Sequence, residues 1–332
     1  MKICVAGSSG HSGRMLQESL KIPGIEVSGY CPGEEGESVS SLGERIAHFG
    51  YPEIRGYDTL EEMLCREKPD VVIVDGAFRN HSSFICTALE HGASVLSEKP
   101  LALSLEELAR VEKAVDSTSA QLWAMQTLRY EPWTLEAKRL IRAGAVGEIR
   151  LLSGQKSYRF GKRGDFYRHR DQYGGTIPWV AIHAIDAFRY LCPLPVHTIF
   201  ARHSRGANRG YGDLEMTAVC MFEMEGGVLA TATADFLRPE TAATHGDDRV
   251  RVAGTKGVLE ILHEKVYLIN PDSDGTEPIK LPEQPGPTLI EDFLNAVQGK
   301  PSGLLDTKQS IESTRLALLA RESADCGKVI TI

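Results

Sequence analysis

The chain has 332 residues, about twice the usual length of one domain, so two hydrophobic cores are expected. With 42% hydrophobic and 25% charged residues, its composition is typical of a globular protein and excludes a disordered one. The net charge of -8 at pH 7 argues against the basic face that nucleic-acid binding requires, and we expect no nucleic-acid partner.

The cysteines and apolar runs predict a cytoplasmic protein. The seven cysteines are scattered and never paired as C-x-x-C, which favours reduced thiols. No apolar run reaches the roughly 18 residues that span a bilayer, and a strand-like run follows Met1 directly, so we expect no leader and no membrane segment. The histidines and cysteines lack the spacing of zinc ligands, and no metal site is expected.

Residues 1–126 alternate short apolar runs with helical stretches, which predicts a doubly wound parallel α/β sheet of the Rossmann type. Ser104 and Glu107 form a capping box for its last helix, which runs to about Val115. The predicted strands are Ile3–Ala6, Glu26–Cys31, Val71–Val74, Ser94–Ser97 and Gln121–Met125, and the other predicted helices are Ser12–Lys21, Thr59–Glu67 and Ser83–His91.

Residues 127–332 show strand-like runs without a helix between each pair, which predicts an α+β domain built on a large, mostly antiparallel sheet. We expect this second domain to bind substrate and to form oligomer contacts. Its predicted strands are Ile149–Ser153, His197–Ala201, Thr217–Phe222, Val228–Ala234, Arg249–Val252 and Val258–Leu262. Its predicted helices are Trp133–Ala143, which ends on Gly144, Trp179–Leu191, Leu289–Val297 and Ser310–Ser323.

The first strand is followed by a glycine-rich turn that opens a helix. Gly7, Gly10 and Gly13 are spaced G-x-x-G-x-x-G, in the strand-turn-helix context of a dinucleotide fingerprint. Glycines let the backbone approach a pyrophosphate, whose charge is favoured at a helix N-terminus. The alternative is a glycine-rich turn that binds nothing.

The residues at the end of the second strand do not indicate whether the cofactor is NAD or NADP. An acidic residue that binds the ribose hydroxyls is expected at its end, where the chain instead reads Tyr30-Cys31-Pro32-Gly33. Glu34 and Glu35 follow, and no arginine stands nearby in the sequence to bind a 2′-phosphate. The cofactor is therefore left as NAD or NADP.

The tripeptide Glu98-Lys99-Pro100 follows a predicted parallel strand at the edge where open α/β sheets bind ligands. Together with several other motifs, it resembles the glucose-fructose oxidoreductase/inositol dehydrogenase (Gfo/Idh/MocA) family over nearly the whole chain. The other motifs are Ala77-Phe78-Arg79-Asn80-His81, Gln126-x-x-Arg129-Tyr130-x-Pro132, Gly147-Glu148-Ile149, Gly174-Gly175 with His183 and Asp186, and Gly254-Thr255-x-Gly257.

The resemblance implies an NAD(P)-dependent oxidoreductase that transfers a hydride between the nicotinamide and a hydroxyl or ketone of a sugar-like or cyclitol substrate. Lys99 would stabilise charge on the reacting oxygen, and His183 would transfer the proton. The implied cofactor contacts are Gly7, Ser9, Gly10, His11, Ser12, Gly13, Cys31, Phe78, His81, Glu98, Lys99, Gln126 and Arg129.

The chain departs from the family pattern four residues before His183. Many dehydrogenating members carry an aspartate there, one helical turn away on the same face, whereas this chain has Trp179. Tryptophan cannot ionise or orient an imidazole as a carboxylate does. Asp186 is either the substitute that orients His183 or a structural acid. Ala181 also replaces a family glycine.

Residues 158–173 form the one basic island we find, with five Lys or Arg against two Asp. The family segment at this position lines the substrate site, where arginines can hold anionic or polyhydroxylated groups. A solvated loop or an oligomer contact explains the segment equally well. The expected substrate contacts are Lys99, Tyr158, Arg159, Arg163, Arg168, Trp179 and His183.

Three functions remain open at this level. The favoured one is an active dehydrogenase or reductase with a small polar substrate. Because Trp179 replaces the family aspartate, the second is a cofactor-binding regulatory or scaffold protein without turnover. The third uses transient oxidation by tightly held NAD to drive elimination or glycoside cleavage. A broad sheet with helices mainly on one side also predicts a homodimer or homotetramer.

Overall fold

The computed structural model describes residues 1–283 and 286–332, which form two compact units. The first unit contains Met1–Gln126, Asp171–Gly174 and Pro287–Arg315. The second contains Thr127–Arg170, Gly175–Gly286 and Leu316–Ile332. The predicted division into 1–126 and 127–332 stays a prediction, and two later segments group with the first 126 residues.

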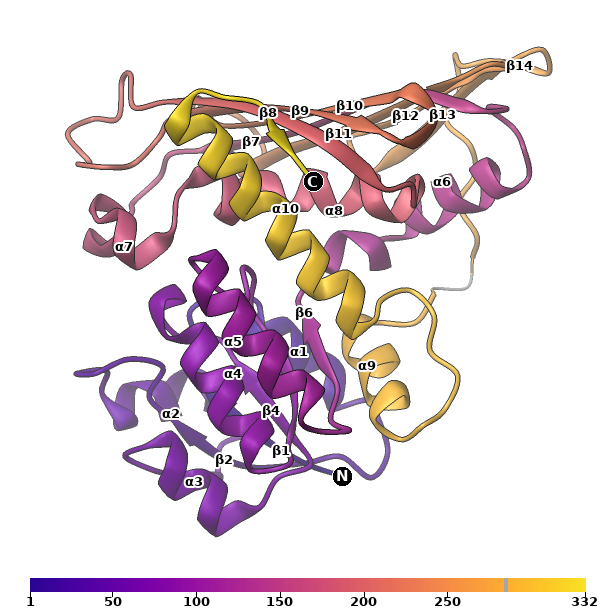
Figure 1. The fold of residues 1–332 in the computed structure, drawn as a ribbon. Coiled ribbons are helices and arrows are strands. Elements are labelled where there is room, and N and C mark those ends of the chain that lie inside the picture. Colours follow the sequence, from indigo (N-terminus) through magenta and orange to yellow (C-terminus); the bar gives the residue numbers. More distant parts are fainter. Residues whose placement is uncertain (284–285) are drawn as a thin grey trace. The chain divides into compact units, whose positions relative to one another are not determined.

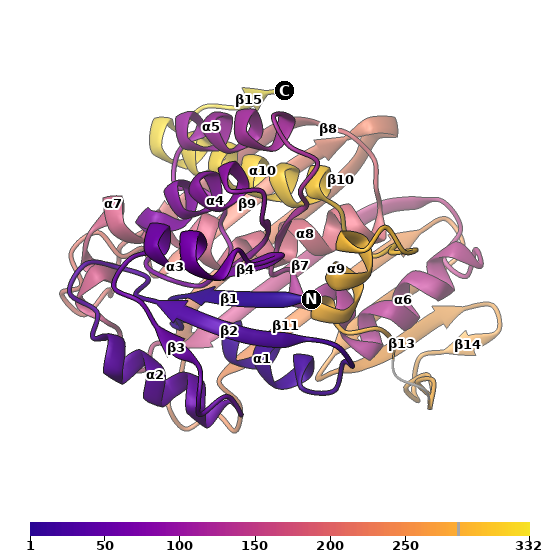
Figure 2. The same cartoon turned by 90° about the horizontal axis from the view of Figure 1, so that it is seen from below.

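The first unit is built on a six-stranded sheet in the order β3-β2-β1-β4-β5-β6, with parallel pairing throughout. β1 therefore lies between β2 and β4 (Figure 2). This confirms the predicted Rossmann arrangement. The strands are β1 (Lys2–Ala6), β2 (Glu26–Cys31), β3 (Arg55–Gly56), β4 (Val71–Val74), β5 (Ser94–Ser97) and β6 (Leu122–Ala124).

Helices connect most of these strands, and Ser38, Thr59 and Ser104 cap three of them. Before the helix Leu105–Asp116, the Ser104 side chain accepts from the Glu107 amide, which confirms the N-cap half of the predicted capping box. The Glu107 carboxylate accepts from the Leu103 amide, one residue before the N-cap. The helix Val39–His48 was not predicted, although Ser38 caps its start and Leu42 and Ile46 form its buried side. The helices are α1 (Ser12–Ser19), α2 (Val39–His48), α3 (Leu60–Glu67), α4 (His81–Glu90), α5 (Leu105–Asp116), α9 (Leu289–Val297) and α10 (Thr307–Cys326).

The segment 287–315 groups with the first unit because it packs on the edge strand β6. The rings of Trp123 and Phe293 lie 5.4 Å apart, edge to face. The Leu122 amide donates to Thr307 Oγ1 and the Ala124 amide to Ser310 Oγ. These two hydroxyl groups of α10 bind amides that β6 would otherwise expose at the sheet edge.

The second unit is built on a nine-stranded sheet in the order β14-β13-β12-β11-β7-β10-β9-β8-β15 (Figure 1). Among the described residues of this sheet, only β7 and β10 pair in parallel, so the predicted mostly antiparallel sheet is confirmed. The strands are β7 (Ile149–Arg159), β8 (Val196–Ser204), β9 (Thr217–Met224), β10 (Val228–Arg238), β11 (Gly246–Gly254), β12 (Val258–Leu262), β13 (Lys265–Asn270), β14 (Ser273–Asp274) and β15 (Ile330–Thr331).

Helices α6 (Pro132–Arg142) and α8 (Ile182–Leu191) lie along one face of this sheet (Figure 1). Contact with α8 is close, since a Cβ on Gly154 of β7 would be 2.9 Å from Ala184 Cβ. The opposite face exposes apolar side chains that alternate with the buried ones. The most exposed of them near the sheet centre are Leu151, Val219, Met221 and Leu229.

No helix in residues 1–283 and 286–332 is long and apolar enough to cross a membrane. Across the same described residues, no group of three or more His, Cys, Asp or Glu side chains is placed to hold a metal ion. All seven cysteines are free thiols.

Candidate functional site

The glycine-rich turn after β1 lies where the strand order of the first unit reverses. At this edge three strand ends touch through glycines. A Cβ on Gly7 would be 2.6 Å from Gly76 Cα, and a Cβ on Gly33 would be 2.3 Å from the same atom. Gly7 also has a positive φ of 77°. Open α/β sheets bind ligands at this switch point, outside the carboxyl ends of the strands.

Two buried carboxylates hold the turn. The amides of Gly10 and Ser12 both donate to Asp75 Oδ2, at 2.9 Å each. The His11 amide donates to Glu98 Oε2 at 3.1 Å, and His11 Nδ1 lies 2.5 Å from the same oxygen. Glu98 was predicted as a site residue and Asp75 was not, although Asp75 directly follows β4 at the same sheet edge.

The electrostatics of the two acids differ. Burial alone would raise the pKa of Glu98, but the charges of His11 and Lys99 lower it to about 2. Burial and the charge of Glu98 raise the pKa of Asp75 to about 7, against the hydrogen bonds from the turn. The charge of Glu98 raises the pKa of His11, although burial opposes this. Asp75 is thus the acid of the pair that titrates near neutral pH.

The predicted Lys99 is buried beside Glu98. Its Nζ lies 3.7 Å from Glu98 Oε1, and its backbone amide donates to the same oxygen. His81 of α4 places Nδ1 2.8 Å from the Pro100 carbonyl oxygen and Nε2 3.2 Å from that of Gly76. His81 therefore links the ends of β4 and β5 around Lys99.

Other predicted cofactor contacts line the same edge. Ser9 donates its amide and its hydroxyl to the Asp75 carbonyl oxygen. The Cys31 carbonyl oxygen accepts from the Gly7 amide, so Cys31 contributes backbone to the turn. Gly13 packs on Phe49, whose ring a Cβ would approach to 2.5 Å. Phe78 is buried in the short 3-10 helix Phe78–Asn80.

Gln126 carries an unusual polar group. Its side chain is buried, and neither Nε2 nor Oε1 has a hydrogen-bond partner within residues 1–283 and 286–332. A buried carboxamide without partners is costly unless a ligand binds it. The glycine cradle, the start of α1 and this carboxamide together fit a nicotinamide dinucleotide.

In the folded chain two arginines lie near the end of β2, although none stands nearby in the sequence. Arg79 Nη2 is 3.4 Å from the Glu34 carboxylate, and Arg45 pairs with Glu37. Glu37 in turn accepts from the Gly33 amide. These arginines come from other segments of the chain, so sequence proximity could not reveal them.

In the second unit, Arg129 and Asp186 form a buried, bidentate ion pair. Arg129 Nε and Nη2 each donate to Asp186 at 2.7 Å, and both side chains are almost fully buried. Of the two roles left open for Asp186, this geometry favours the structural acid. The cofactor contact predicted for Arg129 stays a prediction.

The structure changes the geometry expected around Trp179. Residues Ile177–Ala181 form a π-helix, in which the Ile182 amide donates to the Ile177 carbonyl oxygen five residues back. The α-helical spacing assumed for Trp179 and His183 therefore holds only from Ile182 onward, where His183 is buried on α8. Such π-turns are frequent at functional sites. The Trp179 ring lies 6.4 Å from that of Tyr167.

The arginines of the basic island bind atoms of the second unit. Arg159 donates to the Thr244 carbonyl oxygen, and Arg163 stacks on Phe236. Arg168 stacks on Tyr211 and pairs with Asp165. These contacts leave the substrate role and the solvated-loop alternative both open.

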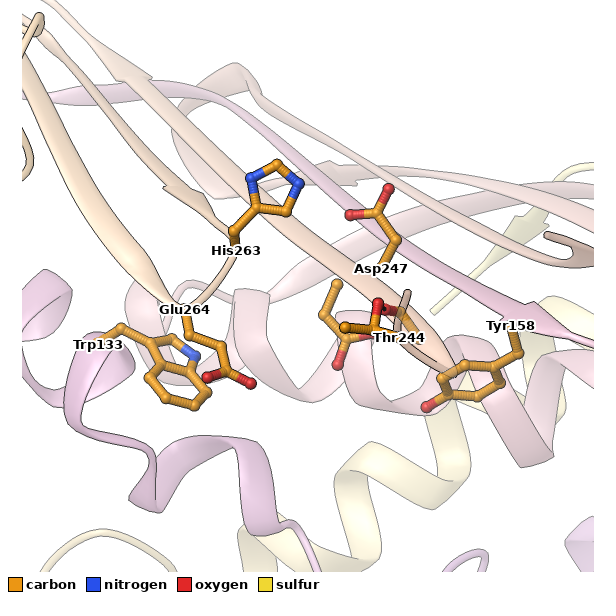
Figure 3. A pocket seen from close by; sticks show the side chains of 8 residues that line it. Trp133, Tyr158, Thr244, Asp247, His263 and Glu264 are labelled. Carbon is orange, nitrogen blue, oxygen red and sulfur yellow. Dashed lines mark hydrogen bonds between the residues drawn. The ribbon is translucent and has the colours of Figure 1, made fainter. Parts of the chain in front are cut away.

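A cavity of about 460 Å³ lies in the second unit, at the ends of β7 and β11 (Figure 3). Of its lining residues, only Tyr158 was predicted as a site residue. The others come from segments far apart in the chain, and no local motif marks them. They are Trp133, Thr244, Gly246, Asp247, Asp248, His263 and Glu264. Beside the cavity, Asp248 forms an ion pair with the buried Lys156.

A glycine turn at the switch point of a six-stranded parallel sheet defines a dinucleotide-binding Rossmann domain. Residues 37–126 match the oxidoreductase family model with an NAD-binding Rossmann fold, and residues 134–260 match the GFO/IDH/MocA C-terminal domain. The chain belongs to the Gfo/Idh/MocA family of oxidoreductases, which confirms the resemblance seen in the sequence.

Curated relatives match parts or the whole of the chain. Glycosyl hydrolase family 109 protein 2 of Bacteroides fragilis is 28% identical over 42% of this chain and 33% of its own length. The scyllo-inositol 2-dehydrogenase (NAD(+)) of Bacillus subtilis is 30% identical over 60% of this chain and 58% of its own length. D-xylose 1-dehydrogenase (NADP(+)) 2 of Haloferax volcanii is 25% identical over 94% of this chain and 95% of its own length. The chain thus spans less than two thirds of the first two relatives.

A solved structure from Thermotoga maritima, named as an oxidoreductase without a stated substrate, is 39% identical to this chain. It covers 100% of both chains with a TM-score of 0.93. That protein therefore has the fold of both units over its whole length.

Proposed function

We propose that this chain is an NAD(P)-dependent dehydrogenase or reductase acting on a CH–OH group, or the matching ketone, of a sugar-like or cyclitol substrate in the cytoplasm. The observation that carries the proposal is Lys99, buried against Glu98 at the carboxyl edge of β5 in an NAD-binding Rossmann domain. Two relatives named as dehydrogenases of scyllo-inositol and D-xylose support the substrate class.

In this proposal the turn from Gly7 to Gly13 holds the diphosphate and Gln126 binds a polar group of the cofactor. The bound nicotinamide would supply or accept the hydride. Glycines at the strand ends let the backbones of these ends approach one another, because any Cβ there would collide with backbone. The start of α1 favours its negative charge. Either NAD or NADP is compatible with this arrangement.

Lys99 and His183 are the proposed catalytic residues. The Lys99 ammonium group donates a hydrogen bond to the reacting oxygen and stabilises negative charge on it. This stabilisation is strongest where water is excluded, and Lys99 is buried. His183 accepts the hydroxyl proton during oxidation and returns it during reduction. Trp179 contributes an apolar wall that excludes water.

Replacing either residue tests this mechanism. Lys99→Ala and His183→Ala should each lower kcat about a hundredfold or more while cofactor affinity, measured by calorimetry, stays nearly unchanged. Oxidation and reduction assays on cyclitols and aldoses with both cofactors supply kcat. Full kcat in Lys99→Ala would refute the mechanism, and failure of the parent chain to bind either cofactor at millimolar concentration would refute the function itself.

Neither Lys99 nor His183 lines the cavity in the second unit. If the substrate extends into this cavity, its lining favours a neutral, polyhydroxylated substrate over an anionic one. Three of its lining side chains, Asp247, Asp248 and Glu264, carry carboxylates that accept hydrogen bonds from hydroxyls. Trp133 and Tyr158 present aromatic surfaces that can stack on sugar rings. A lower KM for a cyclitol than for the matching uronate is the expected result.

A second candidate is glycoside cleavage through transient oxidation, favoured by the relative named as a glycosyl hydrolase. It predicts a cofactor that copurifies and remains unreduced at the end of each cycle. Release of the leaving group from a nitrophenyl glycoside without net NADH formation would select this function. Net NADH formation in proportion to product would exclude it.

The remaining alternative is a regulatory or scaffold protein that binds the cofactor without turnover. Trp179→Asp separates it from the dehydrogenase, because this change restores the family carboxylate. If the parent chain is inactive, the variant should gain turnover on a cyclitol or aldose. In an active dehydrogenase, the same change should not raise kcat.

A further inference from the structure

The site at the start of α1 contains an acid to which the proposed mechanism gives no role. Asp75 follows β4 and is completely buried. A Cβ on Gly10 would be 2.6 Å from Asp75 Oδ1 and 2.6 Å from Glu98 Oε2, so both carboxylates contact the same glycine of the turn. Three amides that open α1 donate to these acids. The charges of both carboxylates therefore lie next to the turn at which the diphosphate is proposed to bind.

The cations near the turn neutralise Glu98 rather than Asp75. His11 and Lys99 form ion pairs with Glu98 at 2.5 and 3.7 Å. Within the described residues Asp75 forms no ion pair, and its Oδ1 has no hydrogen-bond partner. The titratable groups that face the two acids are His11 before α1, Glu98 and Lys99 after β5, and His81 on α4.

We propose that Asp75 is a cofactor-binding residue that takes up one proton from solvent when the dinucleotide binds, so that cofactor affinity falls as pH rises. This inference rests on the proposed function, which requires a dinucleotide at this turn. The proton goes to Oδ1, and no covalent bond of the cofactor forms or breaks. Oδ2 continues to accept from the Gly10 and Ser12 amides, and protonation of Oδ1 removes a negative charge that would repel the diphosphate.

The energetics favour this uptake near neutral pH. Burial and the charge of Glu98 already raise the pKa of Asp75 to about 7 in the free chain. The negative charges of a diphosphate disfavour ionisation further, because like charges repel strongly in a buried site. Above that pKa the free chain carries the carboxylate, so binding must take up close to one proton.

Calorimetry in two buffers of different ionisation enthalpy measures the proton uptake directly. With NADH or NADPH, whichever binds more tightly, the parent chain should take up a fraction of a proton at pH 7 and nearly one at pH 8.5. Its Kd should rise by up to about tenfold per pH unit over this range. A Kd independent of pH together with no proton uptake would overturn the inference and leave the proposed function standing.

Asp75→Asn is the isosteric variant, since its side-chain oxygen can still accept from Gly10 and Ser12. It should bind the cofactor with a pH-independent Kd and without proton uptake. Asp58→Asn, which removes an exposed carboxylate of the same unit, should behave as the parent chain. Unchanged uptake in Asp75→Asn contradicts the inference.

Asp75→Ser serves the same test if Asp75→Asn does not fold, and the parent measurement stands without either variant. Absence of cofactor binding by the parent chain at every pH would overturn the proposed function and this inference together.

Discussion

At the scale of single residues, the Arg129–Asp186 pair predicts a large effect on stability. Asp186→Ala leaves a buried guanidinium without its carboxylate, which should lower the free energy of unfolding by about 3 to 5 kcal/mol. The double variant Arg129→Met with Asp186→Leu should recover much of this loss, because no buried charge remains. Unfolding in urea measures both.

A small effect of Asp186→Ala on stability, with a large loss of kcat and a shifted pH profile, would instead assign Asp186 to the orientation of His183. Sequence spacing could not separate these roles, because Arg129 lies 57 residues away from its partner.

Asp75 also predicts a pH dependence of stability. Its pKa rises from 3.8 to about 7 on folding, so the folded chain holds more protons than the unfolded chain between these values. The contribution of Asp75 to the free energy of unfolding is therefore largest below about pH 4 and is lost as pH rises through 7. Asp75→Asn should remove that fall, and its urea midpoint should exceed that of the parent chain at pH 8 but not at pH 4. Equal differences at both pH values would contradict this.

At the scale of elements, several short strands were predicted with their exact bounds. Val71–Val74, Ser94–Ser97 and Val258–Leu262 match the structure at both ends. Strand β7 continues from Ser153 to Arg159 because its backbone still pairs with β10 and β11, which no local sequence pattern reveals. The π-helix Ile177–Ala181 likewise has no signal in the sequence.

The basic island of residues 158–173 leads to a prediction that ranks the effects of replacing three of its arginines. All three arginines donate to backbone carbonyl oxygens. Arg163 also stacks on Phe236, and its buried Nε has no hydrogen-bond partner in the described parts of the chain, so it keeps a donor for a ligand. If a substrate binds this segment, Arg163→Ala should weaken its binding by about 2 to 5 kcal/mol, the loss typical of a buried charged contact. Arg159→Ala and Arg168→Ala should act less. An unchanged KM in all three would leave the segment a solvated loop or an oligomer contact.

At the scale of the whole molecule, the uncovered sheet face predicts self-association. Val219 and Met221 on β9 and Leu229 on β10 are about half exposed, which a stable monomer seldom tolerates in one contiguous patch. We expect a homodimer or homotetramer at micromolar concentration by light scattering. Val219→Lys with Met221→Asp should dissociate it, whereas Leu20→Glu, in an exposed position of the first unit, should not. A monomeric parent chain would contradict this prediction.

The short strand β15 has a protective consequence. It pairs with β8 through Ile330 and Thr331, and the Ile332 amide donates to the His197 carbonyl oxygen. Without these residues, β8 would offer a row of unsatisfied backbone groups to any extended peptide, which is how many sheet proteins begin to form fibrils. Residues 330–332 thus cover the part of the β8 edge around residues 197–199, and their deletion should increase aggregation, measured by light scattering.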